Sequence, residues 1–197
     1  MSDTRLEACL ARLRPHVDAD ALALTGGVAM TLHVAGSRAW LADVDFVARR
    51  MDAVRSSVTR DFLVSHYHVA QPGVKKSIVQ LVDPETRLRV DVFPDLANAV
   101  ARADWCELAA QPWRIVTAAD LLAHKLALFA RPVDGKHWRD ACALAEILSA
   151  PLPEPPTLVP DVYAQDLALV CDRCTLSRSA DFPLAPKRAI FTLLGHV

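Results

Sequence analysis

The chain has 197 residues, of which 52 % are hydrophobic and 23 % are charged, a composition typical of a globular protein with a buried core and unlike that of a disordered chain. Its 22 basic residues balance 23 acidic ones, so the composition lacks the excess of positive charge that would indicate a nucleic-acid partner. No apolar run is long enough to cross a bilayer, and the five cysteines form no disulfide framework. We therefore expect a cytoplasmic protein with no membrane partner.

Helical and extended segments alternate along the first half of the chain. Leucines at helical spacing predict an amphipathic first helix. The clearest strands are KSIVQLVD and RLRVDVF, two alternating runs joined by residues 84–86, and they predict a hairpin. The first helix is predicted over 4–17. The segments predicted between it and the hairpin are a strand over 21–24, a helix over 28–35, a strand over 43–48, a helical stretch over 51–62 and a strand over 64–69.

From Trp113 onward the sequence is interpreted as helical. Thr117 and Asp120 form a capping-box pattern, and apolar residues at helical spacing continue to Phe129. A second helix is predicted over 136–148, followed by the proline-rich connector PLPEPPTLVP. The pattern predicts an α+β fold, with a mixed sheet, helices packed on it and a helical C-terminal part. The predicted divisions are a core over 1–115, a helical pair over 116–150 and a connector with a tail over 151–197.

Two aspartates one residue apart lie on one predicted strand. Because side chains alternate along a strand, Asp43 and Asp45 point to the same side. Asp91 lies on a later strand, where Val90 and Val92 are expected to point into the core and the carboxylate to the opposite face. If the two strands are adjacent, three carboxylates converge, enough to hold two metal ions or to provide one metal site and a general base. By itself, the pair Asp43 and Asp45 is better explained as solvated residues at a strand edge, and Asp91 alone could also lie on an exposed strand face.

Gly26 and Gly27 lie where a strand gives way to a helix. Such a junction offers unpaired backbone N–H groups to an anion, and glycine lets a phosphate approach the backbone closely. The stretch matches neither the P-loop nor the dinucleotide-binding pattern. By itself, a Gly-Gly pair is more often only a turn.

The order of these features is more specific than any one of them. A strand, Gly26 and Gly27, a helix, Asp43-Val-Asp45 and a later strand aspartate resemble the DNA polymerase β-like nucleotidyltransferase superfamily. Within it, the closest resemblance is to abortive-infection toxins of the AbiEii type and related minimal nucleotidyltransferase-like proteins. Members carry an arginine in the loop before the paired aspartates, a position that Arg38 takes here.

The resemblance continues in VTAADLLAHKLALFARPVDGKHWRDACAL and covers about residues 20–148. Lys125 matches a helical lysine of the family, and Lys136, Arg139 and Asp140 match a basic loop that leads into an Arg-Asp helix. Lys125 also lies on the apolar stripe of its predicted helix, where an ammonium group needs either a route to solvent or an anion such as a triphosphate. Asp140 is also explained as an acid in the first turn of a helix.

The resemblance implies a nucleotidyltransferase that depends on Mg²⁺ or Mn²⁺ and moves a nucleoside monophosphate from a nucleoside triphosphate to an acceptor hydroxyl, releasing pyrophosphate. The implied catalytic and metal-binding residues are Asp43, Asp45 and Asp91. The implied nucleotide-binding residues are Gly26, Gly27, Arg38, Lys125 and Lys136. The acceptor stays open among a small molecule, a tRNA and a protein. The alternative is a catalytically weak or inactive nucleotide-binding or protein-interaction module with a protein partner, of the toxin–antitoxin type.

Cys171 and Cys174 form a C-x-x-C pair in the tail. A zinc site would need two more ligands, and no second paired motif is present, so two reduced thiols are the preferred interpretation. A zinc-stabilised interaction protein is a third alternative. The histidines that could complete such a site are His66, His68 and His196.

Overall fold

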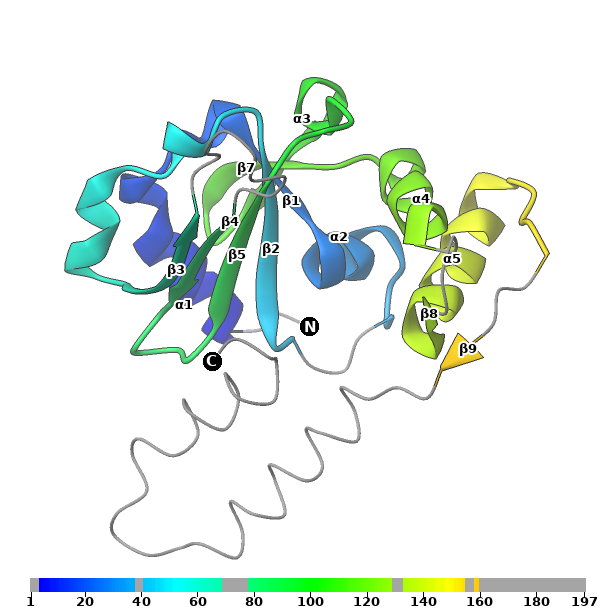
Figure 1. Ribbon diagram of the computed structural model, residues 1–197, viewed down its shortest axis with the longest axis horizontal. Helices are drawn as coiled ribbons and strands as arrows, with labels where there is room; N and C mark the ends of the chain where they lie inside the picture. The colour runs from blue at the N-terminus through cyan, green and yellow to red at the C-terminus, as the bar shows by residue number, and fades with distance from the viewer. Residues whose placement is uncertain (1–3, 38–40, 69–77, 129–132, 155–157, 160–197) are drawn as a thin grey trace, which may run out of the picture. The chain divides into compact units, whose positions relative to one another are not determined.

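A computed structural model describes most of the chain (Figure 1). The described residues are 4–37, 41–68, 78–128, 133–154 and 158–159. They belong to two units, one formed by Met1–Ala127 with Asp140–Leu152 and the other by Leu128–Arg139 with Pro153–Val197. Among the helices of these residues, none has the length and apolar character needed to cross a membrane.

The first unit is built on a seven-stranded mixed sheet. Its strands are β1 (Leu22–Thr25), β2 (Asp43–Ala48), β3 (Leu63–His68), β4 (Ile78–Val82), β5 (Arg89–Pro94), β6 (Asp104–Leu108) and β7 (Gln111–Ile115). They lie in the order β3-β4-β5-β2-β1-β7-β6. The pairs β2–β5 and β1–β7 are parallel, and the other four neighbouring pairs are antiparallel. The predicted α+β fold with a mixed sheet is confirmed.

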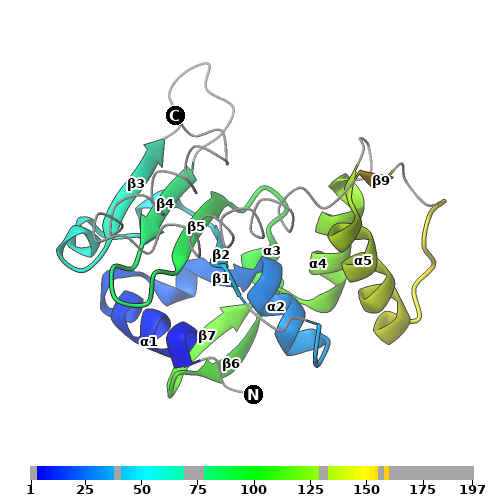
Figure 2. The ribbon, with the colours of Figure 1, turned by 90° about the horizontal axis from the view of Figure 1, so that it is seen from below.

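Helices cover both faces of this sheet. The α-helices of the described residues are α1 (Thr4–Leu13), α2 (Gly26–His33), α3 (Ala99–Arg102), α4 (Ala118–Ala127) and α5 (Gly135–Leu148). Figure 2 shows α1 and α2 on opposite sides of the central strands, and α4 packs against α2. In the second unit, β8 (Val133–Asp134) pairs in parallel with β9 (Leu158–Val159).

The alternation of side chains along β2 separates a core face from a polar face. Val44 and Phe46 are fully buried, whereas Asp43 and Asp45 on the other face are only partly buried. Phe46 packs against Trp113 of β7 with ring centroids 5.5 Å apart. Burying such apolar groups is the main force that fixes the sheet, and it leaves the aspartates on the opposite face, toward α2.

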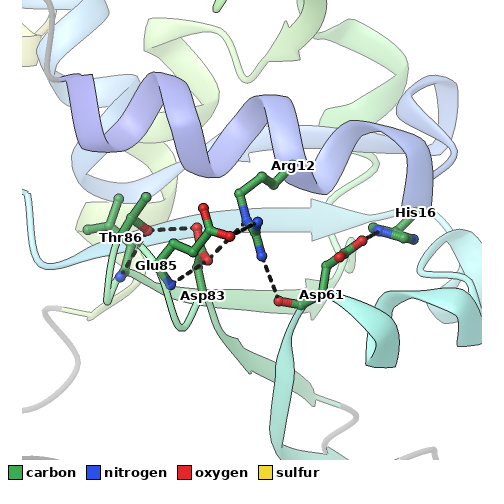
Figure 3. Close-up of polar contacts among 7 residues, drawn as sticks. Arg12, His16, Asp61, Asp83, Glu85 and Thr86 are labelled. Carbon is green, nitrogen blue, oxygen red and sulfur yellow. Dashed lines mark hydrogen bonds and ion pairs between the residues drawn. The ribbon is translucent and has the colours of Figure 1, made fainter.

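Arg12 ties α1 to the turn between β4 and β5 (Figure 3). Its Nε lies 3.2 Å from Oδ1 of the fully buried Asp83, its guanidinium also pairs with Glu85, and its Nη2 donates to the backbone carbonyl of Asp61 at 3.0 Å. Asp83 in turn accepts a hydrogen bond from the Thr86 hydroxyl at 2.8 Å. A buried carboxylate needs such partners, so this cluster secures the hairpin that carries Asp91.

Two predicted helices have different bounds in the structure. The first ends at Leu13, and Arg14–His16 form a short 3-10 helix with Pro15 in its first turn, since proline cannot donate the hydrogen bond that would continue the α-helix. The helix predicted over 28–35 is α2, which begins at Gly26. Both glycines therefore form its first turn.

Two other predictions are wrong. The stretch over 51–62 is not one helix but two 3-10 helices, Met51–Ala53 and Ser56–Arg60, because Val54 between them forms an isolated bridge with Val17. The chain does not become helical at Trp113, which lies in the hairpin of β6 and β7. That hairpin turns through two alanines, which give no turn signal.

Candidate functional site

Three carboxylates converge on the polar face of the sheet. Asp43 and Asp45 lie on β2, and the parallel pairing of β2 with β5 places Asp91 directly beside Asp45. One oxygen from each of the three residues lies within 4.8 Å of the others. The expected adjacency of the two strands is therefore confirmed. The sheet brings together acids that lie far apart in the sequence.

Burial and mutual repulsion perturb two of these acids. Burial, with repulsion from Asp43 and then from Asp91, raises the pKa of Asp45 to about 7, against the opposing charges of Arg89 and Lys125. Burial also raises the pKa of Asp91 to about 6, against the opposing charge of Arg89. A bound cation would offset the repulsion and the burial that raise these pKa values, and would so stabilise the ionised carboxylates.

The chemistry of the donors suits a hard divalent cation. All three residues offer carboxylate oxygens, the ligands that Mg²⁺ and Mn²⁺ prefer. Asp91 Oδ1 is buried and has no hydrogen-bond partner among the described residues. A buried carboxylate oxygen without a partner is costly, and coordination of a cation would satisfy it. The three acids together therefore fit a metal site.

Gly26 lies against one of the three carboxylates. Its φ is +59°, and a Cβ built on it would lie 1.9 Å from Asp45 Oδ2. Only glycine fits this position, because a side chain would need both a left-handed backbone and the space of the carboxylate. The start of α2 is therefore in direct contact with the acidic cluster.

The first turn of α2 leaves backbone N–H groups without helical partners. Thr25, at the cap position of this helix, makes no side-chain capping bond to them. At Gly27 an added Cβ would meet only Leu41 Cδ2, at 3.2 Å. The N-terminus of α2 lies beside the acids, where its N–H groups could donate to an anion that also contacts a bound cation.

Lys125 of α4 forms a buried ion pair. Its Nζ lies 2.9 Å from Asp140 Oδ2, and the two side chains are 7 % and 2 % exposed. The interpretation of Lys125 as a residue that reaches solvent is wrong, because the ammonium is buried. Asp140 lies beyond the first turn of α5 and neutralises this lysine, so its explanation by the helix dipole is also wrong. The positive charge of Lys125, after that of Arg89, lowers the pKa of Asp45.

Arg89 is a site residue that the sequence interpretation missed. Its Nη2 donates to Asp43 Oδ2 at 2.9 Å, and its Nε lies 2.9 Å from Asp91 Oδ2. The register of the parallel strands sets Arg89 beside Asp43, and strand alternation turns it to the same face as Asp91. That alternation is visible in RLRVD and could have revealed it.

Lys136 and Arg38 are the two other side chains predicted to bind the nucleotide. Lys136 lies in the first turn of α5, within the second unit. Arg38 lies outside the described residues, as do Cys171 and Cys174. The roles predicted for these residues stay predictions, as does the division of the chain into three parts.

The chain matches no protein-family model and no curated protein. Among solved structures it is similar to an antigenic nucleotidyltransferase-like protein from Paracoccidioides brasiliensis, with 18 % identity, a TM-score of 0.49, and coverage of 75 % of this chain and 78 % of that one. For the lincomycin-bound lincosamide antibiotic adenylyltransferase LnuA, the identity is 13 % and the TM-score 0.48, over 75 % of this chain and 98 % of that one. For JHP933 from Helicobacter pylori, the identity is 14 % and the TM-score 0.45, over 74 % of this chain and 68 % of that one.

Proposed function

We propose that this protein transfers a nucleoside monophosphate from a nucleoside triphosphate to an acceptor hydroxyl and releases pyrophosphate. The observation that carries the proposal is the convergence of Asp43, Asp45 and Asp91 within 4.8 Å, beside the glycine turn that begins α2. Metal-binding oxygens and an open helix N-terminus are what a triphosphate with its cation requires. The resemblance of the sequence to the DNA polymerase β-like superfamily supports the same reaction.

The three acids have two tasks in this proposal. Asp43 and Asp45 would hold Mg²⁺ or Mn²⁺, and Asp91 would complete the site. The cation, when bound, neutralises the triphosphate and favours ionisation of the acceptor hydroxyl. Asp91 would accept the hydroxyl proton as the general base. The hydroxyl oxygen then bonds to the α-phosphorus as the bond to the pyrophosphate oxygen breaks.

The remaining groups would position the triphosphate. The backbone N–H groups of Gly26 and Gly27 would donate to phosphate oxygens, as the N-terminus of a helix does for anions. Lys125, fixed by its ion pair with Asp140, would add positive charge near Asp45. Positioning and charge stabilisation account for most of the acceleration in phosphoryl transfer generally. We also propose nucleotide contacts for Arg38 and Lys136, on the resemblance alone.

The relation to AbiEii-type toxins and the acceptor are finer parts of the proposal. The alternative is an inactive module of the toxin–antitoxin type that binds a nucleotide or a protein partner. One observation favours it: Arg89 already pairs with two of the acids, at 2.9 Å from each, and so neutralises part of the cluster without a cation. Transfer chemistry is the measurement that separates these functions.

The test uses each nucleoside triphosphate labelled either at the α- or at the γ-phosphate, with Mg²⁺ and a fractionated cell extract as the source of acceptor. We expect α-label to enter an acceptor and γ-label to leave as pyrophosphate, which distinguishes nucleotidyl transfer from phosphorylation. Asp43→Ala and Asp91→Ala should each lower the transfer by at least about 100-fold, the scale of losing one preorganised charge-stabilising group.

Asp52→Asn is the matched control, because Asp52 is an exposed acid that pairs only with the exposed Arg50 among the contacts described for it. It should transfer label at the wild-type rate. Transfer that persists in both site variants would show that the acidic cluster is not the catalytic site. Absence of transfer and of nucleotide binding in the wild type would instead favour the interaction module.

A further inference from the structure

Arg89 occupies the acidic cluster in a way that the proposed reaction does not require. A single guanidinium joins Asp43 on β2 to Asp91 on its own strand, with nitrogen–oxygen distances of 2.9 Å to each. Its side chain is 18 % exposed, and those of Asp43 and Asp91 are 27 % and 4 % exposed. These are partly to fully buried contacts between opposite charges, which solvent screens less than pairs on the surface.

The contacts of Arg89 compete with those of a cation. The guanidinium uses Oδ2 of Asp43 and Oδ2 of Asp91, so two of the three acids are already neutralised in part. A planar guanidinium is always charged and cannot leave by losing its proton. A free divalent cation must therefore either displace Arg89 from these oxygens or bind beside a positive charge.

We infer that Arg89 is a built-in counter-ion that holds Asp43 and Asp91 in place without metal and makes cation binding depend on the nucleotide. This inference rests on the proposed function. A cation that arrives with a triphosphate brings negative charge toward the site, whereas a free cation brings none. Arg89 is a positioning residue in this inference, because it acts through the carboxylates.

The same arrangement has a benefit in the cation-free protein. Without Arg89, the three carboxylates would face one another with only Lys125 as a nearby cation among the described groups that shift the pKa of Asp45. Repulsion between the like charges would then displace the side chains. The guanidinium holds the carboxylates of Asp43 and Asp91 in place, at the expense of affinity for the free metal.

The test measures binding of Mn²⁺ alone to the full chain, without nucleotide, by the loss of the electron paramagnetic resonance signal of the free ion. Arg89→Gln removes the competing charge, and Arg89→Met is a second neutral variant that keeps much of the aliphatic length. A cation that binds these carboxylates beside the guanidinium is repelled by it, and at contact distance this repulsion exceeds the about 1.4 kcal/mol that corresponds to a tenfold change in affinity. We therefore expect both neutral variants to bind Mn²⁺ at least about tenfold more tightly than the wild type.

Two controls show that the effect belongs to the cluster. Arg89→Lys keeps the positive charge and should bind Mn²⁺ about as weakly as the wild type. Asp43→Asn combined with Arg89→Gln should lose the gained affinity. If Arg89 had only a structural role, replacing it would not increase the affinity for a metal ion. Circular dichroism checks that each variant is folded.

The outcomes separate this inference from the proposed function. If the neutral variants bind Mn²⁺ no more tightly than the wild type, and Asp43→Asn abolishes wild-type binding, the inference about Arg89 is wrong while the metal site stands. If no variant binds Mn²⁺ and the nucleotide also brings none, the metal site and the inference both fail. Tighter binding in the neutral variants that disappears with Asp43→Asn supports both.

Discussion

Replacing Gly26 by alanine tests how closely the start of α2 approaches the acidic cluster. Gly26 has φ +59°, a conformation that costs an L-amino acid about 1 to 2 kcal/mol. The new Cβ would also lie 1.9 Å from Asp45 Oδ2, so the carboxylate or the backbone must move. Forcing an extra methyl group into a packed site costs about 1 to 3 kcal/mol. Gly26→Ala should therefore lower the free energy of unfolding by about 2 to 5 kcal/mol.

Gly27→Ala is the matched control in the same helical turn. Its Cβ would contact only Leu41 Cδ2 at 3.2 Å, the end of a flexible side chain. Alanine is favoured over glycine in a helix by about 0.5 to 1 kcal/mol, which offsets this contact. The free energy of unfolding of Gly27→Ala should therefore stay within about 1 kcal/mol of the wild type.

Urea denaturation of both variants in the presence of a chelator measures the difference, with the slope of the unfolding curve as a check that both unfold in the same way. A Gly26→Ala protein that accumulates only in unfolded form, beside a folded Gly27→Ala protein, is the upper limit of the same result. Equal midpoints for the two variants would refute the contact between Gly26 and Asp45.

Three further perturbations test other parts of the structure. Lys125→Met removes the ammonium from the buried Asp140 and should lower the free energy of unfolding, measured by urea denaturation, by about 3 to 5 kcal/mol. The double variant Lys125→Met with Asp140→Leu should recover much of this loss. An equal loss in the single and the double variant would contradict the ion pair. Because the pKa of Asp45 is raised from 3.8 to about 7, the folded metal-free protein binds the proton more tightly, so this contribution to stability is complete below pH 4 and is lost as the pH rises through 7. Asp45→Asn should flatten that decline in denaturation curves taken between pH 5 and 8, and a decline that is the same in both proteins would count against a raised pKa. Ala109 and Ala110 have φ of 53° and 55° in the two-residue turn between β6 and β7. The double variant Ala109→Asn with Ala110→Gly should therefore raise the free energy of unfolding by about 1 to 2 kcal/mol, and the melting temperature with it. An unchanged melting temperature would show that the turn is not strained.

The local pattern of the sequence was sufficient to predict the strands that carry the acids. Val44 and Phe46 alternate with Asp43 and Asp45, and a period of two residues has one structural meaning in a half-buried strand. The hairpin that carries Asp91 was predicted in the same way. The hairpin of β6 and β7 was not, because its turn is formed by two alanines and its strands gave no such pattern.

The sequence by itself determined which residue types the site has, and only the tertiary structure decided which of them touch. Arg89 reaches Asp43 because a parallel pairing brings two strands together, and Lys125 meets Asp140 because the fold brings a residue of α4 to a residue of α5. Gly26 requires glycine because the carboxylate of Asp45 fills the space where a side chain would lie. Charge, size and alternation are properties of single residues or short runs, whereas these contacts are distances between residues far apart in the chain, and packing sets those distances.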